Sequence, residues 1–251
     1  MLRAIAIAVV AIVVALVALA WNAPAAWLGE RLAAASGNTI VLASADGTVW
    51  SGRGALAGSD GRWRIPVAWR VIPSALLRGE LALQFDAAEG AAAPRGTLRF
   101  STDAIAVDGL ALRLPAAALE TALRGRVPVV LGGEFVIEAP AIVTGDRTHS
   151  GSIGVRWEQA NIAAAGADPL ALGTVTMQLD ARGRAFVGPV ANTGGDVRIS
   201  GQIEVLDRGA SVAITLTPVA STPATVTRTL AALGPQAADG SVRLTWRGNV
   251  R

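Results

Sequence analysis

Few side chains in this 251-residue sequence could carry out catalysis or hold a metal ion. Cys, Lys and Tyr are absent, and His149 is the single histidine. A thiol nucleophile, an iron–sulfur cluster, a zinc site built on thiolates and a three-histidine metal centre are therefore excluded. A P-loop is excluded as well, because its signature requires Lys. We expect no bound metal and no cofactor.

The remaining polar side chains are poorly arranged for catalysis. Asp146, His149 and Ser150 would supply an acid, a base and a nucleophile. Neighbours on one loop rarely reach triad geometry, however, and the chain has no G-x-S-x-G nucleophile elbow. Glu134 and Glu138 share one face of a predicted strand and would suit glycoside hydrolysis, but alternating carboxylates are ordinary on a solvent-facing strand. We expect no catalytic residue and no enzyme activity.

A glycine-rich stretch, GRGALA at residues 52–57, fits the dinucleotide-binding pattern G-x-G-x-x-[GA]. That fingerprint requires a helix directly after the glycines. Here the next residues, GSDG at 58–61, predict a turn. We therefore interpret the stretch as a glycine-rich hairpin loop.

Three of the seven tryptophans fall within twenty residues and are interleaved with arginines. Tryptophan and arginine are enriched at the centres of protein interfaces. Two interpretations stay open. The rings pack one end of the sheet, or the region forms a protein-docking surface that includes Trp50, Trp63, Arg64 and Trp69.

The isoelectric point of about 11 does not indicate a nucleic-acid partner. The 22 basic residues face 19 acidic ones, so the net charge is only +3. Without Lys, Tyr or Cys, almost nothing titrates between the carboxylates and the guanidinium groups. A phosphate-binding protein needs a clustered positive excess, and we expect no nucleic-acid binding.

The N-terminal segment is apolar enough to span a membrane. Residues 4–21 (AIAIAVVAIVVALVALAW) contain no polar or charged side chain, and as a helix they would be about 27 Å long. Arg3 precedes them, so the positive-inside rule predicts a cytoplasmic N-terminus. We expect residues 1–21 to form a cytoplasmic stub and a single-pass anchor in a bacterial inner membrane, and residues 22–251 a periplasmic domain. The alternative is a signal peptide with Ala18-Leu19-Ala20 as its cleavage site.

From about residue 38 onward, apolar residues recur at every second position, which predicts half-buried antiparallel strands. The clearest runs are Leu81-x-Leu83-x-Phe85, Leu98-x-Phe100, Phe135-x-Ile137, Ile153-x-Val155-x-Trp157, Val175-x-Met177-x-Leu179, Val197-x-Ile199, Ile203-x-Val205, Val212-x-Ile214-x-Leu216 and Val242-x-Leu244-x-Trp246. The expected fold is mainly β, with a curved antiparallel sheet. Its apolar face must be covered by helices, by the curvature of the sheet, or by a bound partner or lipid.

Glycine and proline occur between these alternating runs. Many runs begin with Gly before a small polar or acidic residue, which predicts hairpin turns with Gly at positive φ. These glycines are Gly79, Gly96, Gly133, Gly151, Gly173, Gly195 and Gly240. A few short helices are expected at residues 22–36, 73–78, 115–124 and 223–233, where Pro lies near the start and Gly follows the end.

Several motifs resemble the type II secretion system protein N family. They are WL at residues 27–28 after the apolar segment, GTVWSG at 47–52, GRWRIPVAWRVIP at 61–73, LLRG at 76–79, LPA at 114–116, LG at 233–234 and DGSVRL at 239–244. The similarity spans nearly the whole chain.

The resemblance implies an accessory, inner-membrane-anchored component of the machinery that exports folded proteins from the periplasm across the outer membrane. It implies contacts with the inner-membrane platform proteins and the secretin, and it supplies no active-site residues. The sheet pattern is also similar to that of AsmA-type proteins, whose curved sheets shelter lipid. The alternative function is therefore a periplasmic carrier for lipid or another hydrophobic ligand.

Overall fold

The computed structural model describes residues 22–86, 93–122, 129–164, 169–206, 209–219 and 224–248. The expected membrane anchor at residues 4–21, with its signal-peptide alternative, lies outside these ranges. Within the described ranges, no helix has both the length and the apolar character needed to cross a bilayer.

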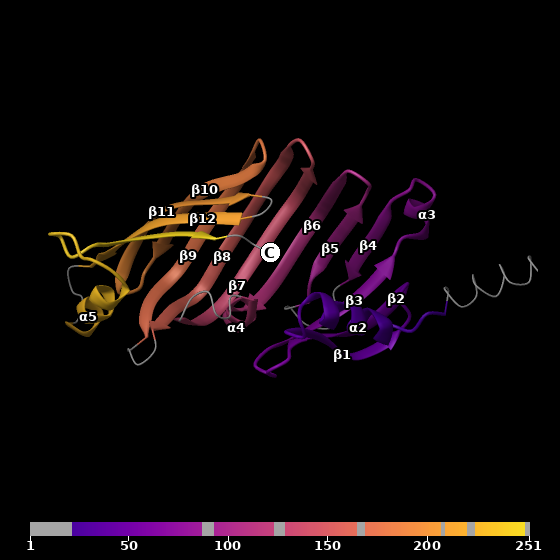
Figure 1. Cartoon of the computed structure of the whole chain (residues 1–251), viewed down its shortest axis with the longest axis horizontal. Coiled ribbons are helices and arrows are strands. Elements are labelled where there is room, and N and C mark those ends of the chain that lie inside the picture. The colour runs from indigo at the N-terminus through magenta and orange to yellow at the C-terminus, as the bar shows by residue number, and fades with distance from the viewer. Residues whose placement is uncertain are drawn as a thin grey trace, which may run out of the picture.

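The described chain forms one antiparallel sheet of thirteen strands in which each strand pairs with its neighbours in sequence (Figure 1). The strands are β1 (Ile40–Gly47), β2 (Ser51–Gly58), β3 (Arg64–Val71), β4 (Leu81–Asp86), β5 (Arg95–Phe100), β6 (Ala104–Pro115), β7 (Val129–Gly145), β8 (His149–Ala164), β9 (Leu170–Arg182), β10 (Ala185–Thr193), β11 (Val197–Leu206), β12 (Gly209–Pro218) and β13 (Val242–Gly248). The helices are α2 (Ala26–Ala35), α3 (Pro73–Leu76), α4 (Ala116–Ala122) and α5 (Ala224–Leu233). The expectation of a mainly β, antiparallel fold with a few short helices is confirmed.

Each alternating run found in the sequence lies in a strand. The runs at 197–199 and 203–205 belong to a single strand, β11, which continues through Gly201. Strand β10 had no clear alternation because Gly188 and Pro189 interrupt it. A Cβ on Gly188 would collide with the carbonyl oxygen of Gln178, so β9 and β10 pack backbone to backbone there.

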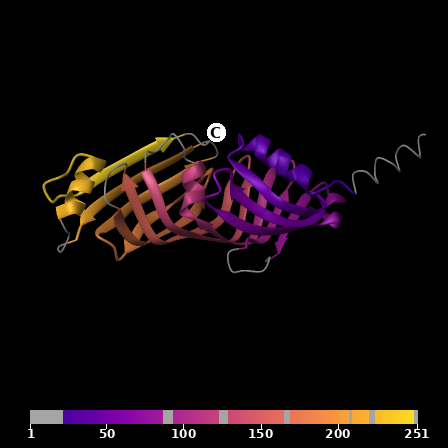
Figure 2. The same ribbon diagram turned by 90° about the horizontal axis from the view of Figure 1, so that it is seen from below.

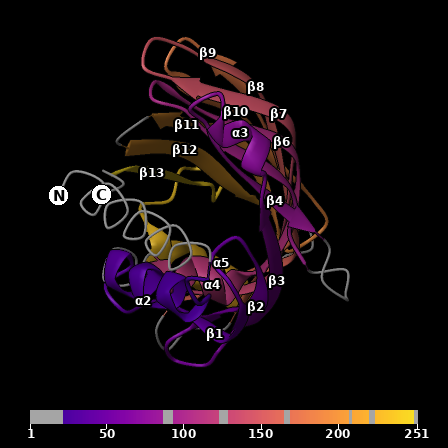
Figure 3. The same ribbon diagram turned by 90° about the vertical axis from the view of Figure 1, so that its right-hand side faces the viewer.

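Glycines inside the long strands bend the sheet. All seven glycines expected at positive φ adopt it. Four of them, Gly96, Gly133, Gly151 and Gly173, lie within β5, β7, β8 and β9 beside register shifts, so the expectation of hairpin turns is wrong at these positions. Bulges of this kind bend a strand and increase its twist. The sheet accordingly curves into a trough (Figure 3).

Three helices cover part of the concave face. In Figures 2 and 3, α2, α4 and α5 lie along the open side of the trough. Helix α2 ends as expected, with Gly37 at φ +62° and the amide of Asn38 donating to the carbonyl of Ala33 at 2.7 Å. Its start is later than expected, at Ala26, and no side chain caps it. Helices α4 and α5 match the predicted segments within the described residues.

The two halves of the trough are filled differently. In the half formed by β7 to β13, a large cluster of buried side chains joins the sheet to α4 and α5. Phe135 and Trp157 lie opposite each other on β7 and β8, and their rings stack 5.0 Å apart. In the half formed by β1 to β4, the described residues form a smaller cluster whose buried members are Ala25, Val67 and Trp69. The N-terminal half therefore has the thinner core.

Candidate hydrophobic interaction site

An apolar cavity of about 460 Å³ lies between α2 and strands β1 to β4. We call it the α2 cavity. Every lining residue is hydrophobic: Leu28, Leu32, Leu42, Val49, Trp50, Leu56, Val67, Trp69, Val71, Leu81, Leu83 and Phe85. Its volume is typical of sites for small ligands. Because Leu81 is 41% exposed, the α2 cavity reaches the protein surface at the start of β4.

The floor of the α2 cavity follows from the alternation in β3. Val67, Trp69 and Val71 are buried on the concave face, whereas Arg64 and Arg70 are exposed on the other side. A strand directs successive side chains to opposite faces, so a run of R-I-P-V-A-W-R-V sends its apolar members inward. This pattern brings Trp69 into the cavity wall.

Glycines on β2 make room for the indole of Trp69. Gly52 pairs with Trp69, and Gly54 pairs with Val67, on the same face of the sheet. A Cβ on Gly52 would lie 2.5 Å from the Cζ2 atom of Trp69. The glycine-rich stretch is therefore a strand and not the expected hairpin loop, and its glycines serve packing. The nucleotide fingerprint has no structural support, because no helix follows β2.

Helix α2 closes the cavity with one face. Leu28 and Leu32 are four residues apart, so they project from the same side of the helix toward the sheet. Trp27 lies on another face and is 48% exposed, with the Arg31 guanidinium 4.9 Å from its ring centroid. The helix thus presents leucines inward and a tryptophan–arginine pair outward.

The structure distributes the four residues of the expected docking surface over two faces of the sheet. Trp50 and Trp69 line the α2 cavity; Trp50 is half-buried, and the Trp69 Nε1 atom donates to the carbonyl of Val49 at 3.3 Å. Trp63 is 7% exposed and lies against Gly58. Arg64 is on the opposite face, where it donates to the Ser44 hydroxyl at 3.0 Å. Only Trp50 and Trp69 are brought together.

The sequence did not identify several of the residues that line the α2 cavity. Leu28, Leu32, Leu42 and Leu56 were not part of the expected surface, although they form its walls. The alternation within residues 64–71 was the signal that could have located the cavity floor. The contribution of α2 depends on how the helix docks, which no local pattern specifies.

The convex face carries an ion-pair network instead of a reactive carboxylate pair. Arg113 donates to Glu134 at 3.0 Å and to Glu158 at 3.4 Å, and Arg156 donates to Glu158 at 2.8 Å. The hydrogen bond from Arg156 is the main reason that the pKa of Glu158 is lowered. Glu134 is thus held by an arginine, as expected for a structural carboxylate on a solvent face.

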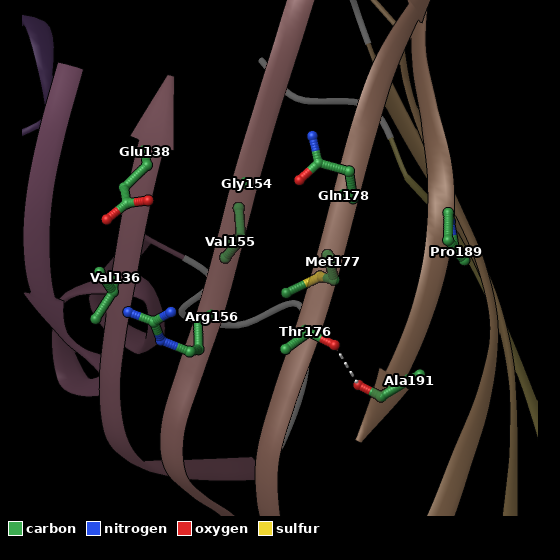
Figure 4. Close-up of a pocket in the computed structure, with 10 residues that line it drawn as sticks. All are labelled: Val136, Glu138, Gly154, Val155, Arg156, Thr176, Met177, Gln178, Pro189 and Ala191. Atoms are coloured by element: carbon green, nitrogen blue, oxygen red, sulfur yellow. Dashed lines mark hydrogen bonds between the residues drawn. The ribbon is translucent and has the colours of Figure 1, made fainter. Parts of the chain in front are cut away.

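Glu138 lies in a shallow hollow of about 270 Å³ on the same convex face, apart from Glu134. Figure 4 shows Glu138, Arg156, Thr176 and Gln178 around it, with the Thr176 hydroxyl donating to the Ala191 carbonyl at 3.4 Å. The hollow exists because Gly154 lies between Glu138 and Gln178 and has no side chain. These groups offer hydrogen bonds but no second carboxylate to act with Glu138.

The sequence suggested that His149 lies in a loop. In the structure, His149 is instead the first residue of strand β8. Its ring stacks on Phe186 at 5.4 Å, and its backbone amide donates to the Gly183 carbonyl at 2.7 Å. Across the described part of the chain, no three acidic or histidine side chains are grouped so as to hold a metal ion. The α2 cavity is therefore the strongest candidate site, and its chemistry is hydrophobic contact.

Comparison with protein-family models identifies the family of the chain. The model for type II secretion system (T2SS), protein N, matches residues 38–245, which is most of the chain. Searches of curated proteins and of solved structures gave no match. The matched range begins just before β1 and ends within β13, so it includes the sheet side of the α2 cavity.

Proposed function

Because the chain belongs to the type II secretion system protein N family, we propose that it serves this machinery as an accessory component that binds other components directly. The family match over residues 38–245 is the observation that carries the proposal. The family is an accessory family of secretion and is not known for enzyme activity. The partners that we propose are inner-membrane platform proteins and the secretin, and the process served is export of folded proteins from the periplasm.

The proposed topology places the sheet in the periplasm. Residues 4–21 would cross the inner membrane once, with the N-terminus in the cytoplasm and residues 22–251 on the periplasmic side. The described chain begins at Asn22, directly after this apolar segment. N-terminal sequencing of the mature protein tests this topology, because cleavage after Ala20 would replace the anchor with a signal peptide.

The rim of the α2 cavity is the contact region that we propose. Trp50 is half-buried there, and a half-buried tryptophan beside an apolar hollow is a typical interface anchor. A partner would insert an apolar side chain beside Trp50. Trp69 supports this rim from within, since it lines the same cavity and is nearly fully buried.

Trp50→Ala is expected to lower recovery of secretion components about tenfold, which is the loss that removing a hot-spot side chain causes. The full-length tagged chain is captured from detergent-solubilised membranes, and co-purified proteins are quantified by mass spectrometry. Leu206→Ala is the matched control, because Leu206 is 46% exposed on β11 in the other half of the sheet. Equal recovery with both variants would remove Trp50 from the contact.

A carrier function is the second candidate, and the uniformly apolar lining of the α2 cavity favours it. A lipid acyl chain or a similar hydrophobic ligand would bind without any polar partner. This candidate and the docking function predict different contents of the cavity, which are a ligand in one case and partner side chains in the other.

Leu83→Trp is expected to fill much of the α2 cavity and to abolish co-purification of a hydrophobic ligand. Native mass spectrometry of the purified full-length chain measures the bound mass. The control is Ile105→Trp, which adds the same ring at a 43% exposed position on β6. If neither the unchanged chain nor the control carries a ligand, the carrier function is wrong and the docking function remains.

A further inference from the structure

The connection between β3 and β4 exposes leucines to an unusual degree. Leu77 is 90% exposed, and its neighbour Leu76 is 43% exposed. Among the large hydrophobic side chains of the described residues, no other exposed fraction exceeds 50%. A surface protrusion that presents adjacent leucines indicates contact with something apolar.

The connection is held in one conformation by its backbone. Pro73 begins the short helix α3, and Gly79 ends the turn with φ +74°. The amide of Glu80 donates to the carbonyl of Ala75 at 3.1 Å, and Ala75 is completely buried. Leu76 and Leu77 therefore point away from the sheet because the fold holds them there.

This protrusion lies at the same end of the molecule as the point where the described chain begins (Figures 1 and 2). The amide of Val49 donates to the carbonyl of Ala23 at 2.9 Å, and the amide of Val71 donates to the carbonyl of Trp50 at 2.6 Å. Two such steps between neighbouring segments place Ala23 roughly 10 Å from Val71, the last residue of β3, from which the connection departs. In Figures 1 and 2, α3 and the first described residues lie at the same end of the molecule.

The charges around the protrusion suit an anionic surface. Arg70 is exposed at the end of β3, and the Arg78 side chain is 61% exposed. The ion pair of Arg78 with Glu80 is long, at 3.7 Å, and leaves its guanidinium accessible. Arg53 and Asp46 form a further ion pair on the neighbouring strands, in which the two charges balance. Leucines beside arginines are the pattern of a segment that lies in a membrane interface.

We propose that Leu76 and Leu77 insert into the periplasmic leaflet of the membrane from which the chain emerges, with Arg78 at the level of the lipid phosphates. This inference rests on the proposed anchoring of residues 4–21. The anchor brings the protrusion to the bilayer at high effective concentration, so a small apolar contact suffices. A transmembrane helix alone would let the sheet swivel, whereas this second contact fixes the orientation of the trough relative to the membrane. It also directs the mouth of the α2 cavity at Leu81 toward the lipid.

The absence of cysteine allows a direct test with single labels. Leu77→Cys is labelled with an environment-sensitive nitrobenzoxadiazole probe in the full-length chain. The chain is reconstituted into vesicles of phosphatidylethanolamine and phosphatidylglycerol, with or without lipids that carry a nitroxide quencher in the acyl chain. The matched control is Val130→Cys, which is 50% exposed at the opposite ends of the strands, on β7.

The label at position 77 is expected to shift its emission to the blue and to be quenched by the nitroxide lipids, whereas the label at position 130 stays in water. If the chain floats with the vesicles but both labels report water, the inference is overturned while the anchor stands. If the chain does not float, both the anchor and the inference are wrong. A blue shift at position 77 that requires added secretion components, and shows no quenching by lipid, would identify a protein surface and overturn the membrane contact.

Discussion

Trp157→Ala is expected to reduce the free energy of unfolding by about 3–5 kcal/mol. Trp157 lies on β8 near the middle of the sheet, 9% exposed and stacked on Phe135. Its Nε1 atom donates to the carbonyl of Gly132 at 2.8 Å. The substitution removes the largest buried side chain of the C-terminal cluster, leaves a cavity, and takes away the hydrogen-bond donor of the partly buried Gly132 carbonyl.

Two further variants separate these effects. Trp157→Phe keeps an aromatic ring opposite Phe135 but loses the hydrogen bond to Gly132, so its cost is expected to be smaller, about 1–3 kcal/mol. Trp27→Ala is the control, because Trp27 is 48% exposed and its removal should change stability by no more than about 0.5 kcal/mol. Urea unfolding of the detergent-solubilised chain, followed by far-ultraviolet circular dichroism, measures all three. Equal losses for Trp157→Ala and Trp27→Ala would contradict the role of the stacked pair.

Trp69→Ala is expected to produce a loss of similar size, about 3–5 kcal/mol, confined to one half of the molecule. Trp69 is 6% exposed and is one of three buried members that the described residues contribute to the cluster beneath α2. Removing it also enlarges the α2 cavity. Because the strands of the other half have a separate buried cluster, they should keep their stability.

Hydrogen exchange measured by mass spectrometry tests this difference. Amide protection should fall in β1 to β4 and in α2, and should be retained in β8 to β12. Trp157→Ala serves as the reciprocal variant, since its effect should fall on the C-terminal strands. A uniform loss of protection in Trp69→Ala would show that the sheet unfolds as one cooperative unit and that its two halves are not independent.

The strands were predictable because their periodicity is local. A half-buried strand shows its apolar face in its own residues, as in Ile153-x-Val155-x-Trp157, and each such run is a strand. The periodicity does not identify strand β10, because Gly188 and Pro189 interrupt the alternation. Glycine is required at position 188 because a Cβ there would collide with the Gln178 carbonyl on the neighbouring strand β9. A local pattern predicts the secondary structure of its own segment, but not the contacts that the segment makes with neighbouring strands.

The glycines also show which features local sequence predicts and which depend on a neighbouring strand. Positive φ at Gly133 and Gly151 could be expected from their position before an acidic and a small polar residue, respectively. Whether such a glycine forms a turn or a bulge depends on the partner strand, since the register shifts involve residues far away in sequence. The GRGALA stretch illustrates this further, because Gly52 makes room for Trp69, seventeen positions later.

The amino-acid sequence by itself determined the β class of the fold, the placement of most strands, the backbone conformation of the key glycines and the family resemblance. It also ruled out thiol chemistry, since the chain contains no cysteine. Tertiary structure alone decided that Trp50 and Trp69 share a cavity while Arg64 faces away from it. It also decided that Leu76 and Leu77 protrude at the end of the molecule where the described chain starts (Figures 1 and 2). The physical reason is that alternation sets which face a side chain takes, whereas register, bulges and helix docking set which residues meet across that face.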